Sequence, residues 1–188
     1  VLYLNGKIIT QIIKFRLSKK KDEILNIDMT KVANVILYML HKQVSHLNDR
    51  KLSIMLFLMD YNHSKFCDSK IFDEEYLKAS RNPEPVILSE LFDVIANNED
   101  LDEEDPRLFL IQELLEFLDI EVKEKDNFVE LKFIKMDEDF DDTLFSKDEM
   151  TTINKVVQAH LSTTPRNVAN DCFKIEEVRN TPKGEIIF

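Results

Sequence analysis

The sequence predicts a mainly α-helical domain of the α+β class, a compact body of about five to six helices with a small antiparallel sheet. Apolar residues recur at helical spacing in several segments, and residues 120–133 alternate between apolar and charged side chains. With only 2 Gly and 5 Pro in 188 residues, the composition does not suit long flexible linkers. We assign residues 29–188 to this domain and residues 1–28 to a basic N-terminal arm or strand pair.

The first predicted helix covers residues 29–47, with Asp28 or Thr30 as its N-cap. Asn48 and Asp49 end this helix and cap the next one, which is apolar on nearly all sides. Because a helix without a polar face has to be covered all round, we expect this second helix to be the buried centre of the domain.

The segment after the central helix has no clear period. We expect residues 68–82 to be extended or irregular. Residues 82–85, Asn-Pro-Glu-Pro, predict a turn, because each proline disfavours helical backbone in the residue before it. Residues 86–96 then place apolar side chains on one helical face and predict a third helix.

An acidic loop and a hairpin are expected in the middle of the chain. Residues 97–105 are strongly acidic, and Pro106 begins a fourth helix, since the first helical turn tolerates proline. The alternating residues 120–133 predict a hairpin that turns at Asp126 and Asn127 and buries one face.

Two helices and a strand complete the prediction. Ser146 and Glu149 form a capping-box pattern for a fifth helix over residues 147–160. A short sixth helix begins near Pro165, and residues 184–188 are expected to be an edge strand.

The chain is acidic, but its N-terminal arm is basic. The net charge is −11, which makes nucleic acid an unfavourable partner, because duplex binding relies on Lys and Arg that neutralise phosphates. Six of the 25 basic residues and none of the 36 acidic residues fall within residues 1–21.

The arm allows three interpretations. We favour a strand pair with a basic tail, because Asn5-Gly6 is a strong hairpin signal. The second is a basic amphipathic arm that binds the acidic body or an anionic partner. The third is a product that begins at Met29. A secretory signal is not indicated, since the basic residues follow the apolar stretch.

The acidic run at residues 137–142 matches a calcium loop only in part. Asp137, Asp139 and Asp141 have the spacing of the first three ligands, but the Gly and the Glu that such a loop needs are missing. We therefore expect a solvated acidic loop or a docking face for basic groups, without a bound cation.

Catalytic motifs do not occur in the sequence. There is no HExxH, CxxC, GxSxG, phosphate-binding loop or dinucleotide fingerprint. Cys67 and Cys172 read as a reduced pair, and no apolar run reaches the roughly 18 residues of a membrane span. We expect a cytoplasmic protein that is not an enzyme and uses no cofactor or metal.

Two short motifs occur in order within residues 47–95. Residues 51–58 read KLSIMLFL and are followed by His63, and Glu84-Pro85-Val86 precedes the third helix. In this order the motifs resemble the opening of the Panacea domain, where a "KLqKLLYl" helix leads through an extended stretch to a "GPV" turn. This domain is found in phage-associated and toxin–antitoxin proteins.

Later segments extend the resemblance over residues 29–188. Residues 145–160, 163–173 and 184–187 are similar to the last two helices and the closing strand of the family. The chain departs from the family at Glu84, which replaces the Gly of GPV, and in the region that carries His and Trp in the family. The resemblance implies a compact, mainly helical domain with a small sheet. Family members neutralise diverse toxins by direct contact, at least one is a proteolytic adaptor, and no catalytic residues carry over.

We therefore expect a protein-interaction module of the antitoxin type, whose partner is a toxin encoded by an adjacent gene. The alternative is a phage or mobile-element adaptor or structural protein. The expected contact face includes residues 68–86, because an extended segment with two prolines is poor core material. For the aromatic residues, core packing is the first interpretation and a binding stripe the second. The candidate contact residues are Tyr61, His63, Phe72, Tyr76, Arg81, Glu84 and Pro85.

Overall fold

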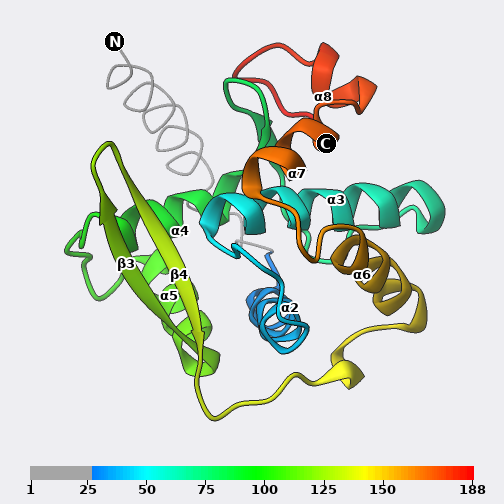
Figure 1. Cartoon of the computed structure of the whole chain (residues 1–188). Helices are drawn as coiled ribbons and strands as arrows, with labels where there is room; N and C mark the ends of the chain where they lie inside the picture. Colours follow the sequence, from blue (N-terminus) through cyan, green and yellow to red (C-terminus); the bar gives the residue numbers. More distant parts are fainter. Residues whose placement is uncertain (1–26) are drawn as a thin grey trace.

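The computed structural model describes residues 27–188, so the expectations for the arm at residues 1–28 lie outside the described residues except for its last two positions. Over the described part, seven α-helices and two antiparallel two-stranded sheets confirm the predicted class (Figure 1). In chain order the elements are α2 (Met29–His41), α3 (Asp49–Cys67), β1 (Tyr76–Lys78), β2 (Pro83–Pro85), α4 (Val86–Ala96), α5 (Pro106–Phe117), β3 (Leu118–Lys125), β4 (Phe128–Lys135), the 3-10 turn η1 (Asp142–Leu144), α6 (Lys147–Ala159), α7 (Pro165–Cys172) and α8 (Glu176–Asn180).

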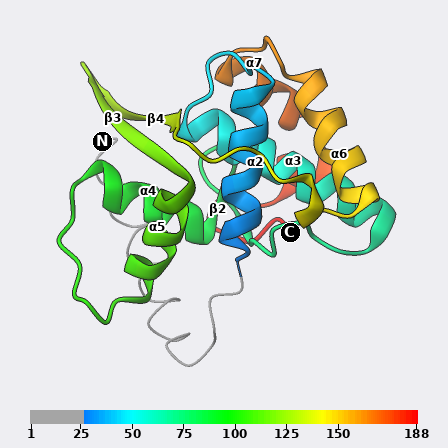
Figure 2. The same ribbon diagram turned by 90° about the horizontal axis from the view of Figure 1, so that it is seen from below.

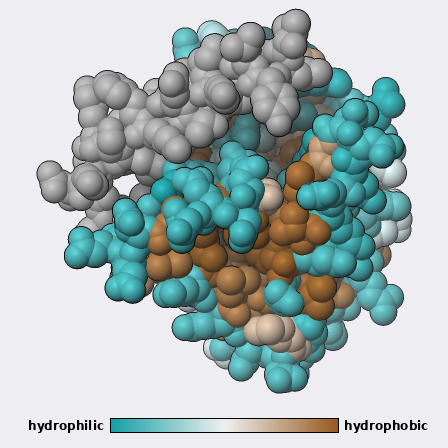
Figure 3. Space-filling model, turned by 90° about the vertical axis from the view of Figure 1, so that its left-hand side faces the viewer, coloured by the Kyte–Doolittle hydropathy of each residue, from teal (hydrophilic) through white to brown (hydrophobic). Residues whose placement is uncertain are grey.

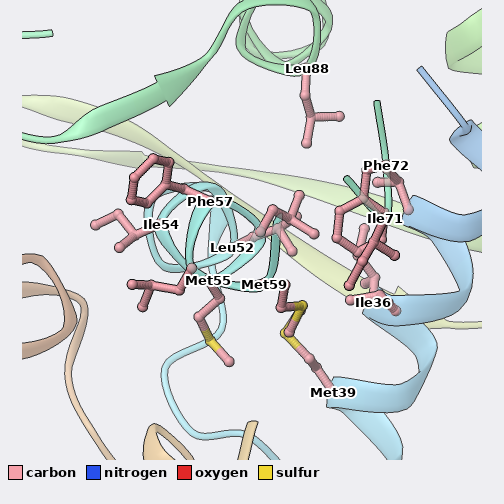
Figure 4. Close-up of a cluster of buried hydrophobic side chains, with 14 of the residues drawn as sticks. Ile36, Met39, Leu52, Ile54, Met55, Phe57, Met59, Ile71, Phe72 and Leu88 are labelled. Carbon is pink, nitrogen blue, oxygen red and sulfur yellow. The ribbon is translucent and has the colours of Figure 1, made fainter. Parts of the chain in front are cut away.

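The helix α3 lies at the centre of the domain, as predicted. The Asn48 side chain accepts a hydrogen bond from the backbone N–H of Lys51 at 2.9 Å and so begins the helix. α2 crosses α3, with α6 and α7 on one side and α4, α5 and the β3–β4 hairpin on the other (Figure 2). The close-up shows side chains of α3 gathered with Ile36 and Met39 of α2 and Leu88 of α4 (Figure 4).

The helix α2 begins at Met29 as predicted, with Asp28 as its cap, but it ends at His41 and does not continue to residue 47. Gln43 adopts a left-handed conformation with φ of 57°, which turns the chain out of the helix. The N–H of Val44 still bonds the carbonyl of Met39 at 3.0 Å, so the helix end is capped by backbone.

The buried side chain of Lys51 fixes the loop that follows α2. Its Nζ donates hydrogen bonds of 2.7 Å to the carbonyl oxygens of Ser45 and Thr163. Lys51 therefore ties this loop to the connection between α6 and α7, and burial lowers its pKa to about 8.

The turn expected at residues 82–85 is wrong, because Pro83–Pro85 forms the strand β2 and pairs with β1, Tyr76 opposite Pro85. The chain reverses just before it, where the N–H of Ala79 bonds the carbonyl of Asn82 at 3.0 Å. Prolines are tolerated here because, among the residues that the structure describes, β2 pairs only with β1 and is an edge strand.

The C-terminal residues lie against the other edge of β1. The N–H of Ile187 bonds the carbonyl of Tyr76 at 2.8 Å, and Leu77 and Ile186 form an isolated antiparallel bridge. Residues 184–188 thus pair with the edge of a sheet, as predicted, but they do not form a regular strand.

Most of the remaining predictions agree with the structure. α4 has the predicted bounds, and the hairpin turns at Asp126 and Asn127, between β3 and β4. Ser146 and Glu149 make both hydrogen bonds of the capping box of α6. The short α8 and the turn η1 were not predicted from the sequence.

The acidic run at residues 137–142 is used locally. Asp139 pairs with Lys135, and Asp141 accepts a hydrogen bond from the N–H of Thr143 at 2.9 Å at the start of η1. Within the described residues, no three His, Cys, Asp or Glu side chains are grouped as a metal site would require.

Among the described helices, none has the length and apolar character to cross a membrane. Cys67 is exposed, Cys172 is buried, and the two are not joined.

Candidate functional site

Four of the seven predicted contact residues lie in the core. Tyr61, His63, Phe72 and Tyr76 are between 0% and 7% exposed. Phe72 points into the cluster around α3 in the close-up (Figure 4). The expectation that residues 68–86 are poor core material is therefore wrong, and these four side chains are not available to a partner in this structure.

A hydrogen-bond network around Asp60 of α3 holds the segment that carries Phe72 and Tyr76. Oδ1 of Asp60 accepts from the backbone N–H groups of Ile71 at 2.6 Å and Phe72 at 3.1 Å. Its Oδ2 accepts from the phenol of Tyr76 at 2.8 Å. Burial raises the pKa of Asp60 to about 6, although these hydrogen bonds act in the opposite direction. These hydrogen bonds hold the irregular segment around residues 71–76 against α3.

The Glu74 side chain binds the backbone at the start of α4. Its carboxylate accepts from the backbone N–H groups of Glu75 at 2.9 Å, Ile87 at 3.2 Å and Leu88 at 3.0 Å. Burial raises its pKa to about 7. A carboxylate at a helix N-terminus satisfies N–H groups that have no partner within the helix. We therefore assign Asp60 and Glu74 to folding.

The other three predicted residues differ in exposure, and only Arg81 and Glu84 reach the surface. Arg81 is exposed, and its guanidinium lies 4.5 Å from the centre of the Phe173 ring. Pro85 is buried directly before α4. Glu84 is partly buried and lines a groove, so it is the one predicted contact residue found there.

This groove has a volume of about 620 Å³. It lies between the first turn of α3, the β1–β2 connection, α4 and the strand β4. Its lining combines acidic, polar and apolar side chains, which are Asp49, Arg50, Ser53, Ile54, Ala79, Ser80, Asn82, Pro83, Glu84, Ser89, Phe92, Asp93, Ala96, Asn97, Phe128, Val129 and Leu131.

The hairpin forms one wall because it is joined to α3. Asp49 accepts a hydrogen bond from the backbone N–H of Leu131 at 3.0 Å, and Asn48 and Lys132 form an antiparallel bridge. The far end of the hairpin extends away from the body beyond α4 (Figure 1). The groove therefore opens between this end and the β1–β2 connection.

Three carboxylates give the groove its charge. Desolvation by surrounding protein atoms raises the pKa of Asp49, Glu84 and Asp93. Asp93 still reaches solvent. The negative charge of Asp49 raises the pKa of Asp93 further. The negative charge of Asp93 in turn raises the pKa of Glu84. Among the described lining residues Arg50 alone is basic, and its guanidinium lies 4.6 Å from the Phe128 ring centre. A cation that enters the groove would relieve the repulsion among these carboxylates.

The groove also has an apolar wall. Ile54, Phe92 and Leu131 are buried at its base, whereas Phe128 is 43% and Val129 38% exposed. The side of the molecule that carries the hairpin, α4 and α5 shows hydrophobic residues gathered in the middle of its face (Figure 3). Lysine and arginine have apolar stems and charged heads, so such side chains match a lining of this kind.

One buried polar atom of the lining has no hydrogen-bond partner among the described residues. Oδ1 of Asn82 is buried and accepts no hydrogen bond from the described residues. Since buried acceptors are nearly always paired in native proteins, this atom suits a donor from a bound group.

Asp49, Asp93 and Asn82 were not predicted as site residues. The sequence indicates a helix cap at Asp49 and a turn at Asn82, and both interpretations describe local structure only. No pattern in the chain relates these positions to Val129, because tertiary packing of the hairpin brings them together.

The comparisons with known proteins give no further guide to the site. No protein-family model matches the chain, and neither a curated protein nor a solved structure is significantly similar to it.

Proposed function

We propose that this chain is a protein-interaction module, and that its groove takes a cationic, extended segment of a partner protein. The resemblance to the Panacea domain makes an antitoxin that neutralises a toxin from an adjacent gene the first candidate. In this proposal the chain works by binding alone, in the cytoplasm.

The observation that carries the proposal is the composition of the groove. Asp49, Glu84 and Asp93 gather negative charge beside the apolar surface of Phe128 and Val129. Interfaces commonly combine aromatic anchors with complementary charge, and charge complementarity selects partners. An extended peptide with Lys or Arg beside apolar residues satisfies both features.

Co-expression with the neighbouring reading frame tests this proposal. The product of that frame alone should slow growth, and the wild-type chain should restore growth. The double variant Glu84→Gln, Asp93→Asn removes two groove charges and no side-chain hydrogen bond to the backbone of the described residues, so it should lose this rescue.

A matched control removes two charges elsewhere. Glu103→Gln, Glu104→Gln lies in the exposed loop before α5 and changes the net charge equally, so it should rescue growth like the wild type. Equal rescue by both double variants would argue against the groove as the binding site. A neighbouring product that is never toxic would remove the antitoxin role and leave an adaptor or structural protein as the alternative.

A further inference from the structure

The outer edge of the strand β3 pairs with no other strand among the described residues. β3 is 8 residues long and pairs with β4 alone, and the two strands form a sheet of their own. The start of α3 occupies the other edge of β4, through the bridge between Asn48 and Lys132 and the hydrogen bond from Leu131 to Asp49. β3 lies on the side of the hairpin away from α3 (Figure 1). An open edge strand of this length can pair with a strand of another chain.

Alternate residues of β3 direct their backbone groups toward this open edge. In an antiparallel pair, residues that exchange hydrogen bonds with the partner strand alternate with residues that do not. The N–H of Ile120 bonds the side chain of Asp119 at 2.8 Å, so it points away from β4. Leu131, which lies opposite Val122, likewise donates its N–H outside the hairpin, to α3. Ile120, Val122 and Glu124 therefore present their backbone groups at the edge.

The charged side chains of β3 follow a regular order on one face. Asp119, Glu121, Lys123 and Lys125 occupy alternate positions, so all four point to the same side of the sheet. Nζ of Lys123 lies 3.6 Å from Oε2 of Glu121, in agreement with a shared face. These two side chains are 36% and 48% exposed, and Asp119 and Lys125 are exposed as well. Two acidic residues are followed by two basic ones, so the order is complementary to its own reverse.

We propose that two copies of the chain pair through β3, antiparallel about a two-fold axis at Val122, and form a four-stranded sheet. In this register Asp119 lies opposite Lys125 of the second copy, and Glu121 lies opposite Lys123 of the second copy. Each pair occurs twice, because a two-fold interface uses the same surface of both copies. A register centred on Glu121 or on Lys123 places that residue opposite its own copy, and like charges directly opposite each other are unfavourable. Charges often protect an open edge from pairing, but this order of charges favours one register.

Two further observations suit a second copy of the chain. β3 and β4 together carry four acidic and four basic side chains, whereas the chain has a net charge of −11. The strands of the hairpin are therefore neutral, and two copies can approach there with less repulsion than at an acidic surface. On the other face of β3, Val122 is 41% exposed and would lie against its own copy, which removes apolar surface from water.

The pairing leaves the groove open. Its described lining includes Phe128, Val129 and Leu131 of β4 but no residue of β3. A dimer would therefore carry two accessible grooves. The inference does not rest on the proposed function, and either can fail while the other stands.

Sedimentation velocity of the full chain over a range of concentrations tests the proposal. The wild type should change from monomer to dimer as its concentration rises. Glu121→Lys should raise the dissociation constant of the dimer about tenfold or more, because two opposite-charge pairs become like-charge pairs, and Lys123→Glu should do the same. The control Glu103→Lys lies in the exposed loop before α5 and changes the net charge as Glu121→Lys does, so it should dimerise like the wild type.

An equimolar mixture of the Glu121→Lys and Lys123→Glu chains is the decisive measurement, because Glu121 also lies opposite Lys132 within its own hairpin. In a mixed dimer every pair again has opposite charges. The mixture should therefore dimerise about as tightly as the wild type, although neither variant does so alone, and this recovery would also show that both variants are folded. A wild type that stays monomeric at all concentrations would overturn the proposal. So would a dimer that Glu121→Lys leaves unchanged, that Glu103→Lys weakens equally, or that the mixture does not restore.

Discussion

Oδ1 of Asp49 accepts a hydrogen bond from the backbone N–H of Leu131 at 3.0 Å, which joins the first residue of α3 to the hairpin. The two residues lie far apart in the sequence, and both line the groove. The bond therefore holds one wall of the proposed binding site in place. Burial raises the pKa of Asp49, and this hydrogen bond acts in the opposite direction because it stabilises the charged carboxylate.

Asp49→Ala should lower the free energy of unfolding by about 1–3 kcal/mol, because the N–H of Leu131 loses its acceptor. Asp49→Asn should cost less, since the amide oxygen keeps the hydrogen bond while the charge is lost. Urea unfolding of both variants measures the difference. Two variants of equal stability would show that the bond does not hold the hairpin.

Tyr76→Phe should destabilise the chain by about 1–2 kcal/mol, because Asp60 loses its hydrogen bond to the phenol while the ring remains in place. Tyr61→Phe is the matched control. Its hydroxyl faces Lys65 and Glu177, which are 53% and 49% exposed, so water replaces the lost contact. Thermal unfolding compares the two, and a larger loss for Tyr61→Phe would contradict this account of the segment.

The buried carboxylates predict a particular pH dependence of stability. Glu74 has a pKa of about 7 in the folded chain against 4.5 as its ordinary value, so between these pH values the folded state binds more protons than the unfolded state. Its contribution is therefore present at low pH and is lost as the pH rises through 7. Asp60 acts in the same direction, with a folded pKa of about 6.

Glu74→Gln isolates this effect, because glutamine does not titrate. The stability of the wild type relative to the variant should fall between about pH 4.5 and 7, by on the order of 1–3 kcal/mol. Denaturant titrations over this range measure the difference. A difference that is constant with pH would mean that folding does not raise the pKa of Glu74.

Lys51→Met should destabilise the chain by about 2–4 kcal/mol, since the carbonyls of Ser45 and Thr163 lose a charged donor. Lys132→Met is a suitable control, because Lys132 is exposed on the hairpin. Urea unfolding again provides the measurement. Equal stability of the two variants would show that Lys51 does not anchor the two loops.

Local signals in the sequence predicted much of the fold. Asn48, the capping box at Ser146 and the proline at residue 106 marked helix starts correctly, because each cap depends on neighbours a few residues away. The short α8 has no side-chain cap hydrogen bond and was not predicted.

The candidate site was much less predictable. Asp60 accepts hydrogen bonds from the backbone N–H of Phe72 and from the phenol of Tyr76, and the sequence shows no period that relates these positions. Glu84 was predicted as a contact residue because it lies within residues 68–86. That segment is largely buried, and Glu84 lines the groove only because of how the chain packs. Asp93 joins it only through the packing of α4 against the hairpin.

The central claim is that the groove binds a cationic segment, and titration of the full chain with a fluorescein-labelled oligoarginine peptide tests it most directly. Fluorescence anisotropy should show binding to the wild type that weakens about threefold to tenfold in Glu84→Gln, Asp93→Asn. The control Glu103→Gln, Glu104→Gln has the same net charge as the groove variant and should bind like the wild type. Equal weakening in both double variants would show that the peptide responds only to the overall acidity of the chain, and would contradict the claim.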